Sequence, residues 1–99
     1  MPKSERSWGD VMKVKTIYNG HTLELRRTLG GISFIVNGEV KGMAGGKLHN
    51  HKVNQTFTAE IDGAKDRGAS VRAELKLGWL VDKVSFYYQD RLVDEKILL

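Results

Sequence analysis

His49 and His51 are the two residues whose types and spacing best suit metal chemistry in this chain. Residues two positions apart share a face of an extended segment, so the two imidazoles could bind zinc or copper together. His21 could act as a third ligand only if the fold brought it near. The chain contains no cysteine, and no carboxylate close to the pair completes a ligand set. We therefore favour two surface histidines in a flexible loop and expect no metal or other cofactor.

The residues that catalysis requires do not form a recognisable pattern. The serines stand in strand-like surroundings without a nucleophile-elbow motif, and cysteine chemistry is excluded. The glycine-rich run at 42–47 lacks the spacing of a phosphate-binding loop, and Leu48 stands where serine or threonine would bind magnesium. Asp62 and Asp66 flank a loop without a partner that the sequence can place. We therefore expect a protein that is not an enzyme; a small metal-binding or enzymatic β protein is the second alternative.

The basic residues offer the first alternative, a nucleic-acid-binding module. Residues 1–58 contain nine Lys or Arg and four Asp or Glu, whereas residues 59–99 contain seven and eight. Such asymmetry can mark a surface for nucleic acid or other anions. However, Glu24 shares the predicted wet face, and most aromatic rings fall at core positions, where they cannot stack on bases. A solvated face of mixed charge is therefore favoured over a nucleic-acid face, whose residues would be Lys13, Lys15, Arg26 and Arg27.

Trp79 and Tyr87 are the best candidates for exposed aromatic side chains. Trp79 follows Gly78 at a predicted turn, and Tyr87 lies on the strand face opposite Phe86. Exposed aromatic residues mark contacts with proteins or other ligands, although burial under a second sheet is the arrangement we favour for both rings. If the last predicted strand is an exposed edge, it could pair with a partner strand or another copy.

The leading hypothesis is a small non-enzymatic domain that mediates protein–protein interaction or self-association. It predicts an exposed apolar edge or patch near residues 79–98. A membrane partner is not expected, because no apolar run approaches the ~20 residues that span a bilayer. Hydrophobic residues make up 40% of the chain and charged residues 28%, ordinary values for a soluble globular protein. The first ten residues lack the apolar stretch of a secretory signal, so we expect a cytoplasmic protein.

The elements that must position these residues are predicted to be strands. The chain has 99 residues, which suffice for one domain, and we expect a flexible N-terminal tail over 1–10 and a single β domain over 11–99. Apolar residues alternate with charged ones at Val71, Ala73, Leu75 and Leu77, a pattern typical of a strand with one buried face. Similar patterns predict seven or eight strands at 12–18, 22–29, 32–36, 40–44, 53–62, 71–77, 84–89 and 92–98, the last being a strand or a short helix.

Tight turns are predicted between these strands. Asn19-Gly20 and Asn37-Gly38 are strong signals for two-residue hairpin turns, because both residue types tolerate positive φ. Gly30-Gly31 marks another turn, and Asp90-Arg91 is the predicted tip of the last hairpin. Because no segment has convincing helical periodicity, we predict an all-β fold, either an antiparallel β-sandwich or a small barrel.

One stretch resembles a known family. The run NGHTLELRRTLGGISFIVNGEV, from Asn19 to Val40, is similar to the opening hairpins of the Fas-apoptosis-inhibitory-molecule domain. The resemblance consists of a Gly-His start, alternating strands and a Val-Asn-Gly turn, and it covers about a fifth of the chain. It implies a small β-sandwich, and no function is carried over from it.

Overall fold

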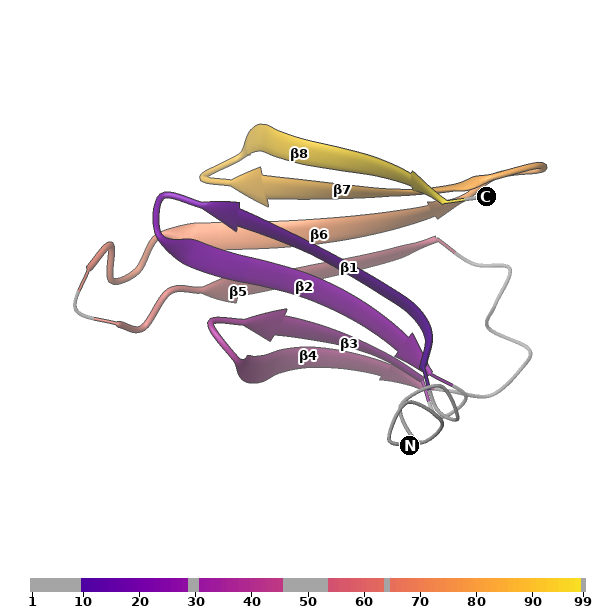
Figure 1. The fold of residues 1–99 in the computed structure, drawn as a ribbon. Helices are drawn as coiled ribbons and strands as arrows, with labels where there is room; N and C mark the ends of the chain where they lie inside the picture. Colours follow the sequence, from indigo (N-terminus) through magenta and orange to yellow (C-terminus); the bar gives the residue numbers. More distant parts are fainter. Residues whose placement is uncertain (1–9, 29–30, 46–53, 64, 99) are drawn as a thin grey trace, which may run out of the picture.

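The chain forms two antiparallel sheets of four strands each (Figure 1). The computed structural model describes residues 10–28, 31–45, 54–63 and 65–98, and within these residues it contains strands and no helix. The expected all-β antiparallel fold is thus confirmed. The strands are β1 (Asp10–Tyr18), β2 (His21–Thr28), β3 (Gly31–Val36), β4 (Glu39–Gly45), β5 (Gln55–Glu60), β6 (Ser70–Leu77), β7 (Asp82–Tyr88) and β8 (Arg91–Leu98).

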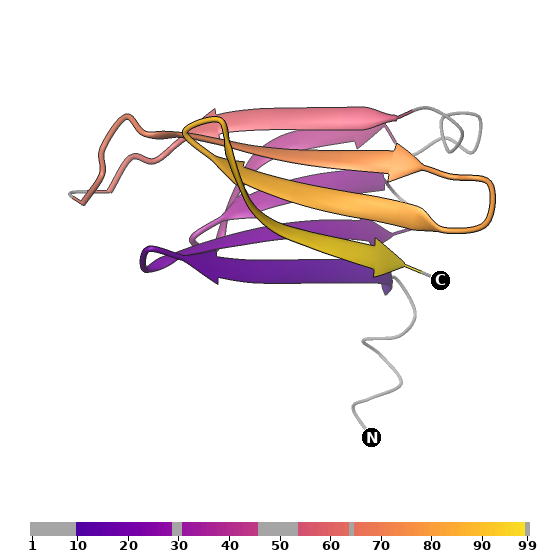
Figure 2. The same cartoon turned by 90° about the horizontal axis from the view of Figure 1, so that it is seen from above.

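Each sheet is built from strands that follow one another in the sequence. The first sheet has the order β1-β2-β3-β4 and the second has the order β5-β6-β7-β8. The two sheets lie one over the other, with β4 and β5 along one side and β1 and β8 along the other (Figure 2). The hydrogen-bonded partners of every strand are therefore its neighbours in the chain.

The core lies between the two sheets and follows from the alternation of apolar residues. In β6 the buried residues alternate with more exposed charged ones, and β2 buries Leu23 and Leu25 toward the same interior. Residues 92–98, for which both strand and helix were considered, belong to strand β8. The central core cluster consists of Val14, Leu23, Leu25, Ile32, Phe34, Val36, Phe57, Ile61, Ala69, Val71, Ala73, Leu75, Val84 and Phe86.

The sheets approach most closely on the side of β4 and β5. A Cβ atom added to Gly42 in β4 would lie 3.3 Å from Cδ1 of Phe57 in β5, so a glycine allows this approach. The predicted strand at 40–44 corresponds to β4, which extends from Glu39 to Gly45. Lys41 also bonds Asp62, just after β5, and the ammonium group lowers the pKa of that carboxyl.

The two Asn-Gly pairs connect neighbouring strands directly. Asn19 and Gly20 join β1 to β2 with φ angles of 54° and 81°. Asn37 and Gly38 join β3 to β4 with φ angles of 52° and 84°. These are left-handed conformations, which asparagine and glycine adopt at little cost.

The last hairpin turns one residue earlier than predicted. Its tip is Gln89 and Asp90, with φ angles of 53° and 65°, and Arg91 already belongs to β8. Contacts with β6 hold this turn: the amide of Gln89 donates to the carbonyl of Ser70, and the Asp90 carboxylate accepts from Arg72 at 2.8 Å. Long-range contacts thus compensate for a conformation that glutamine rarely adopts.

Two predictions fall wholly or partly outside the described residues. Residues 1–9, most of the predicted tail, are not described, and Asp10 is the first residue of β1. The predicted Gly30-Gly31 turn also includes a residue outside the described ranges.

Candidate binding surface

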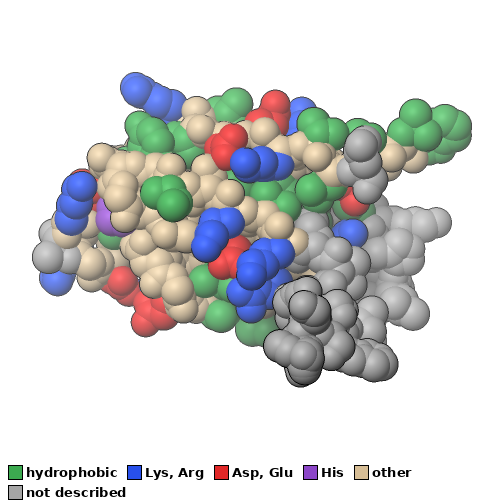
Figure 3. All heavy atoms as spheres, viewed as in Figure 1, with side chains coloured by type: hydrophobic (Ala, Val, Ile, Leu, Met, Phe, Trp, Pro, Cys, Tyr) green, Lys and Arg blue, Asp and Glu red, His purple; other side chains and the backbone are tan. Residues whose placement is uncertain are grey.

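The β6–β7 connection, residues 78–81, presents two large apolar side chains to solvent. Trp79 is 94% exposed and Leu80 is 80% exposed. This connection projects beyond the body of the molecule, and hydrophobic side chains gather at its end (Figures 1 and 3). The prediction that a second sheet buries Trp79 is wrong, because the residue lies past the ends of the strands. We call residues 78–81 the Trp79–Leu80 tip.

A close backbone contact shapes this tip. A Cβ atom on Gly78 would lie 2.2 Å from the carbonyl oxygen of Val81, a distance that no real Cβ tolerates. The path of the loop between its two ends therefore requires a glycine at position 78. A residue with a Cβ at position 78 would force the loop onto another path, and this would move the two exposed side chains.

Further apolar side chains are exposed on β8, the edge strand of the same sheet. Ile97 is 56% exposed and lies opposite Lys83 of β7. The neighbouring pair, Asp82 and Leu98, is the one nearest the tip in this ladder. Leu92 is 48% exposed and lies opposite Tyr87. The exposed apolar residues within 79–98 therefore include members on both the tip and β8.

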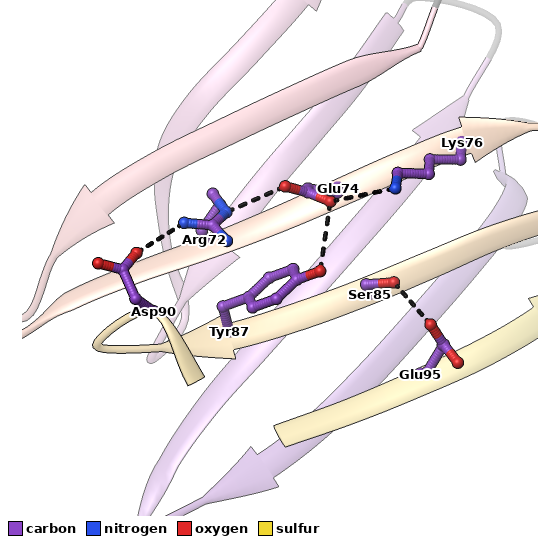
Figure 4. Close-up of polar contacts among 7 residues, drawn as sticks. All are labelled: Arg72, Glu74, Lys76, Ser85, Tyr87, Asp90 and Glu95. Carbon is purple, nitrogen blue, oxygen red and sulfur yellow. Dashed lines mark hydrogen bonds and ion pairs between the residues drawn. The ribbon is translucent and has the colours of Figure 1, made fainter. Parts of the chain in front are cut away.

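Tyr87 takes part in a network on the outer face of the second sheet (Figure 4). The guanidinium of Arg72 lies 4.0 Å from the ring centroid, and the tyrosine hydroxyl donates to Glu74 at 3.4 Å. Arg72 also donates to Glu74 at 3.1 Å and to Asp90 at 2.8 Å. Tyr87 is half-buried by these side chains of its own sheet, so the prediction that a second sheet covers it is also wrong.

Ser85 and Glu95 form a separate polar contact on the same sheet. Ser85 is 2% exposed, and its hydroxyl donates to Glu95 at 3.2 Å (Figure 4). The Glu95 carboxylate also pairs with Lys83 at 3.4 Å. The Ser85 hydroxyl is therefore buried and hydrogen-bonded within its own sheet.

The structure does not bring the four candidate nucleic-acid residues onto one face. Lys13 lies opposite Arg26 on the outer face of the first sheet, and Lys15 lies opposite Glu24. The Glu24 carboxylate accepts from Arg26 at 2.9 Å, so a negatively charged side chain lies among these positively charged ones. Arg27 alternates to the inner side of β2 and pairs with Asp82 of β7 at 3.7 Å, between the sheets.

His21 forms a polar cluster at the end of the molecule opposite the tip. Its ring is 6% exposed, and Nε2 lies 2.9 Å from the Asp66 carboxylate. Asn37 Nδ2 lies 3.1 Å from the other ring nitrogen, Nδ1, and Asn37 Oδ1 accepts from the backbone amide of Thr22. Asn19 also donates to Asp66 at 3.0 Å. We use the name His21 cluster for the residues His21, Asn37, Asp66, Tyr88 and Asn19.

The hydrogen bonds of the cluster determine the tautomer of His21. A backbone amide can only donate, so the Asn37 oxygen must face Thr22 and its NH₂ group must face His21. Nδ1 therefore accepts a hydrogen bond, and Nε2 carries the proton that it donates to Asp66. Both ring nitrogens of His21 take part in hydrogen bonds, so a metal ion would have to displace Asn37 or Asp66 to bind this residue.

Hydrogen bonding within the cluster changes the acidity of two members. The bond from His21, and secondarily one from Tyr88, lowers the pKa of Asp66 below its ordinary value of 3.8. Burial, followed by the bond to Asp66, raises the pKa of Tyr88. No pattern in the sequence indicates this cluster, because His21 and Asp66 are far apart in the chain and their pairing depends on the fold.

The described residues also contain neither a group of candidate metal ligands nor a membrane-spanning helix. No group of three or more His, Asp or Glu in the described part of the chain could hold a metal ion, and His49 and His51 lie outside it. The same residues contain no helix long and apolar enough to cross a membrane. Comparisons with models of protein families, with curated proteins and with solved structures found no match for this chain.

Proposed function

We propose that this protein is a non-enzymatic binding module that docks a protein partner through the Trp79–Leu80 tip, and that its sheets form an open β-sandwich. One observation carries the proposal: adjacent tryptophan and leucine side chains are 94% and 80% exposed on a loop whose shape requires Gly78. Burying each in a partner would contribute roughly 1.5–3 kcal/mol. Tryptophan is among the residue types that are enriched at the energetic centres of protein interfaces.

The polar groups support binding rather than catalysis. The only described histidine uses both ring nitrogens in hydrogen bonds. Glu74 and Glu95 each accept from a hydroxyl and pair with a basic side chain. A general base or nucleophile needs a free lone pair facing a reactant, whereas these groups bond to one another.

The charged residues beside the tip already have partners within their own sheet. Lys76 and Lys83 lie directly opposite each other on β6 and β7, on the strands that join the tip. Lys76 lies 3.9 Å from Glu74, and Lys83 lies 3.4 Å from Glu95. The surface that fits the exposed side chains of the tip is therefore an apolar pocket.

The proposal is tested by comparing the wild type with a Trp79→Ala, Leu80→Ala double variant. Ile17→Ala is the matched control, because Ile17 is 70% exposed on the other sheet. Proteins that bind the wild type and the control but not the double variant are identified, purified and titrated against all three. We expect the double variant to bind at least roughly tenfold more weakly, as for an interface hot spot.

Two results would contradict the proposal. Equal affinity of the purified partner for the wild type and the double variant would exclude the tip as its docking site. Binding of the wild type, but not the double variant, to phosphatidylserine vesicles, without any protein partner, would assign the tip to a lipid surface instead.

A further inference from the structure

The four edge strands differ in how they are protected against pairing with another chain. The register of β1, β4 and β8 with their neighbours shifts by one residue, which places one extra residue, a β-bulge, in each of these edge strands. Each of the three also carries at least one lysine. Bulges and lysines are the common means of preventing edge-to-edge association. β5 has a regular register with β6 and no lysine.

The backbone groups on the free edge of β5 can be assigned from one hydrogen bond. The amide of Ile61 donates to the carbonyl of Ala69, so this pair bonds across to β6. Bonded pairs alternate in an antiparallel ladder, so Gln55, Phe57 and Ala59 also bond to β6. The N–H and C=O groups of the intervening residues, Thr56, Thr58 and Glu60, therefore point away from β6. β5 runs along the margin of the molecule (Figure 2).

We propose that β5 pairs in antiparallel fashion with β5 of a second copy of this chain, about a two-fold axis at Thr58. In this register Thr58 lies opposite Thr58 of the second copy, and Thr56 lies opposite Glu60. All three outward-facing residues then bond in reciprocal pairs, which gives about six hydrogen bonds. The two second sheets join into one continuous sheet. This is an isologous contact that closes after two copies, as in most homodimers.

The side chains of β5 fit a second copy of themselves. Threonine pairs and threonine–glutamate pairs place no like charges opposite each other, and the two Glu60 side chains lie at opposite ends of the new ladder. On the inner face Phe57 lies opposite Ala59 of the second copy, so a large side chain meets a small one. Self-pairing of β1 about Val14 would instead place Lys13 opposite Lys15 of the second copy, which is unfavourable.

This contact is independent of the proposed function, because it uses β5 and not the Trp79–Leu80 tip. Either proposal, the β5 dimer or partner docking at the tip, can therefore be contradicted without affecting the other. Variants of the tip are expected to leave dimer formation unchanged, and variants of β5 are expected to leave partner binding by each subunit unchanged.

Disulfide crosslinking tests the register. The natural chain has no cysteine, so Thr58→Cys introduces a single thiol in each copy. Opposed residues of a hydrogen-bonded antiparallel pair have Cα atoms about 5.5 Å apart, within the reach of a disulfide. We expect Thr58→Cys to form a covalent dimer in glutathione disulfide at least roughly tenfold faster than Thr56→Cys, whose residue faces Glu60. Equal rates for the two variants would overturn the proposed register.

Sedimentation equilibrium of the wild type tests the dimer itself. We expect reversible dimerisation, and a chain that stays monomeric up to about 1 mM, the weakest affinity of interest, would overturn the proposal. Thr58→Pro removes an N–H group that does not bond to β6, so β5 should stay in its sheet. It should raise the dimer dissociation constant roughly tenfold or more, whereas Thr58→Val keeps the backbone groups and should not. Dimerisation of a folded Thr58→Pro variant with wild-type affinity would also contradict the proposal.

Discussion

The two ends of this molecule are built on opposite principles. At one end Asn19, Asn37, Tyr88 and the loop containing Asp66 meet around the buried ring of His21. Every buried side-chain nitrogen and oxygen in the described ranges has a hydrogen-bond partner. At the other end Trp79 extends into solvent with 94% of its surface exposed. The comparison indicates that stability is concentrated at the His21 end, which leaves the tip available for a partner.

The largest loss in the free energy of unfolding is expected when the hydrogen bonds of His21 are removed. His21→Ala removes two hydrogen bonds and leaves Asn37 and Asp66 without their partner, so we expect a loss of about 2–3 kcal/mol in the free energy of unfolding. Urea denaturation measures this loss. A change below about 0.5 kcal/mol, the usual range for surface substitutions, would show that the cluster does not stabilise the fold.

A smaller effect is expected when the backbone of the tip is disturbed. Gly78→Ala places a Cβ against the Val81 carbonyl, so we expect a loss of about 1–2 kcal/mol together with weaker partner binding. Gly63→Ala is the matched control, since nothing lies within 4 Å of the Cβ it would add. If both variants unfold at the same urea concentration, the close approach of residue 78 to the Val81 carbonyl does not restrict the residue at this position.

The acid sensitivity of the His21 end follows from Asp66. Its pKa in the folded protein is below the ordinary value of 3.8, so the unfolded chain binds more protons at pH values between the two. Its contribution is therefore complete above the ordinary value and is lost as pH falls through the folded value. The Asp66 side chain is 27% exposed, which weakens this effect through solvent screening.

Urea denaturation between about pH 2 and pH 7 tests this dependence. Asp66→Asn should flatten the curve below about pH 4, while Trp79→Ala should keep the acid dependence of the wild type. An unchanged slope in Asp66→Asn would show that other carboxylates account for the whole effect.

The smallest effect on stability is expected from the tip side chain itself. Trp79→Ala should change the free energy of unfolding by less than about 0.5 kcal/mol, because the residue buries almost nothing in the isolated protein. Thermal and urea denaturation measure this directly. A loss above about 1 kcal/mol, outside the range of ordinary surface substitutions, would mean that Trp79 packs on the body in solution and that the contrast between the ends is overstated.

Features that depend on local pattern could be predicted from the sequence. The alternation of Val71, Ala73 and Leu75 predicted a strand with one buried face, and these residues are indeed in the core. The same alternation places Arg27 among the apolar residues of β2, where a charged side chain needs a partner, and Arg27 pairs with Asp82. The partner itself could not be named, because pattern shows which face a residue occupies and not what lies across the interior.

Features that depend on distant contacts could not be predicted. The Gln89–Asp90 turn lacks a glycine and depends on Ser70 and Arg72 of another strand. Trp79 was misassigned to the interior because a tryptophan after an apolar strand is usually buried. It is exposed because it lies in the connection between β6 and β7, and the one-dimensional pattern does not show how far this connection extends past the opposite sheet.

The order of the strands has a consequence for how the chain reaches its native state. Residues 10–45 contain the whole first sheet and residues 55–98 contain the whole second sheet, so every ladder is made between adjacent segments. Loop closure for each hairpin is short, and only the packing of sheet on sheet requires distant parts of the chain to meet. Each half can therefore complete its strand pairing separately, and two fragments divided between β4 and β5 should reassemble into the native fold when mixed.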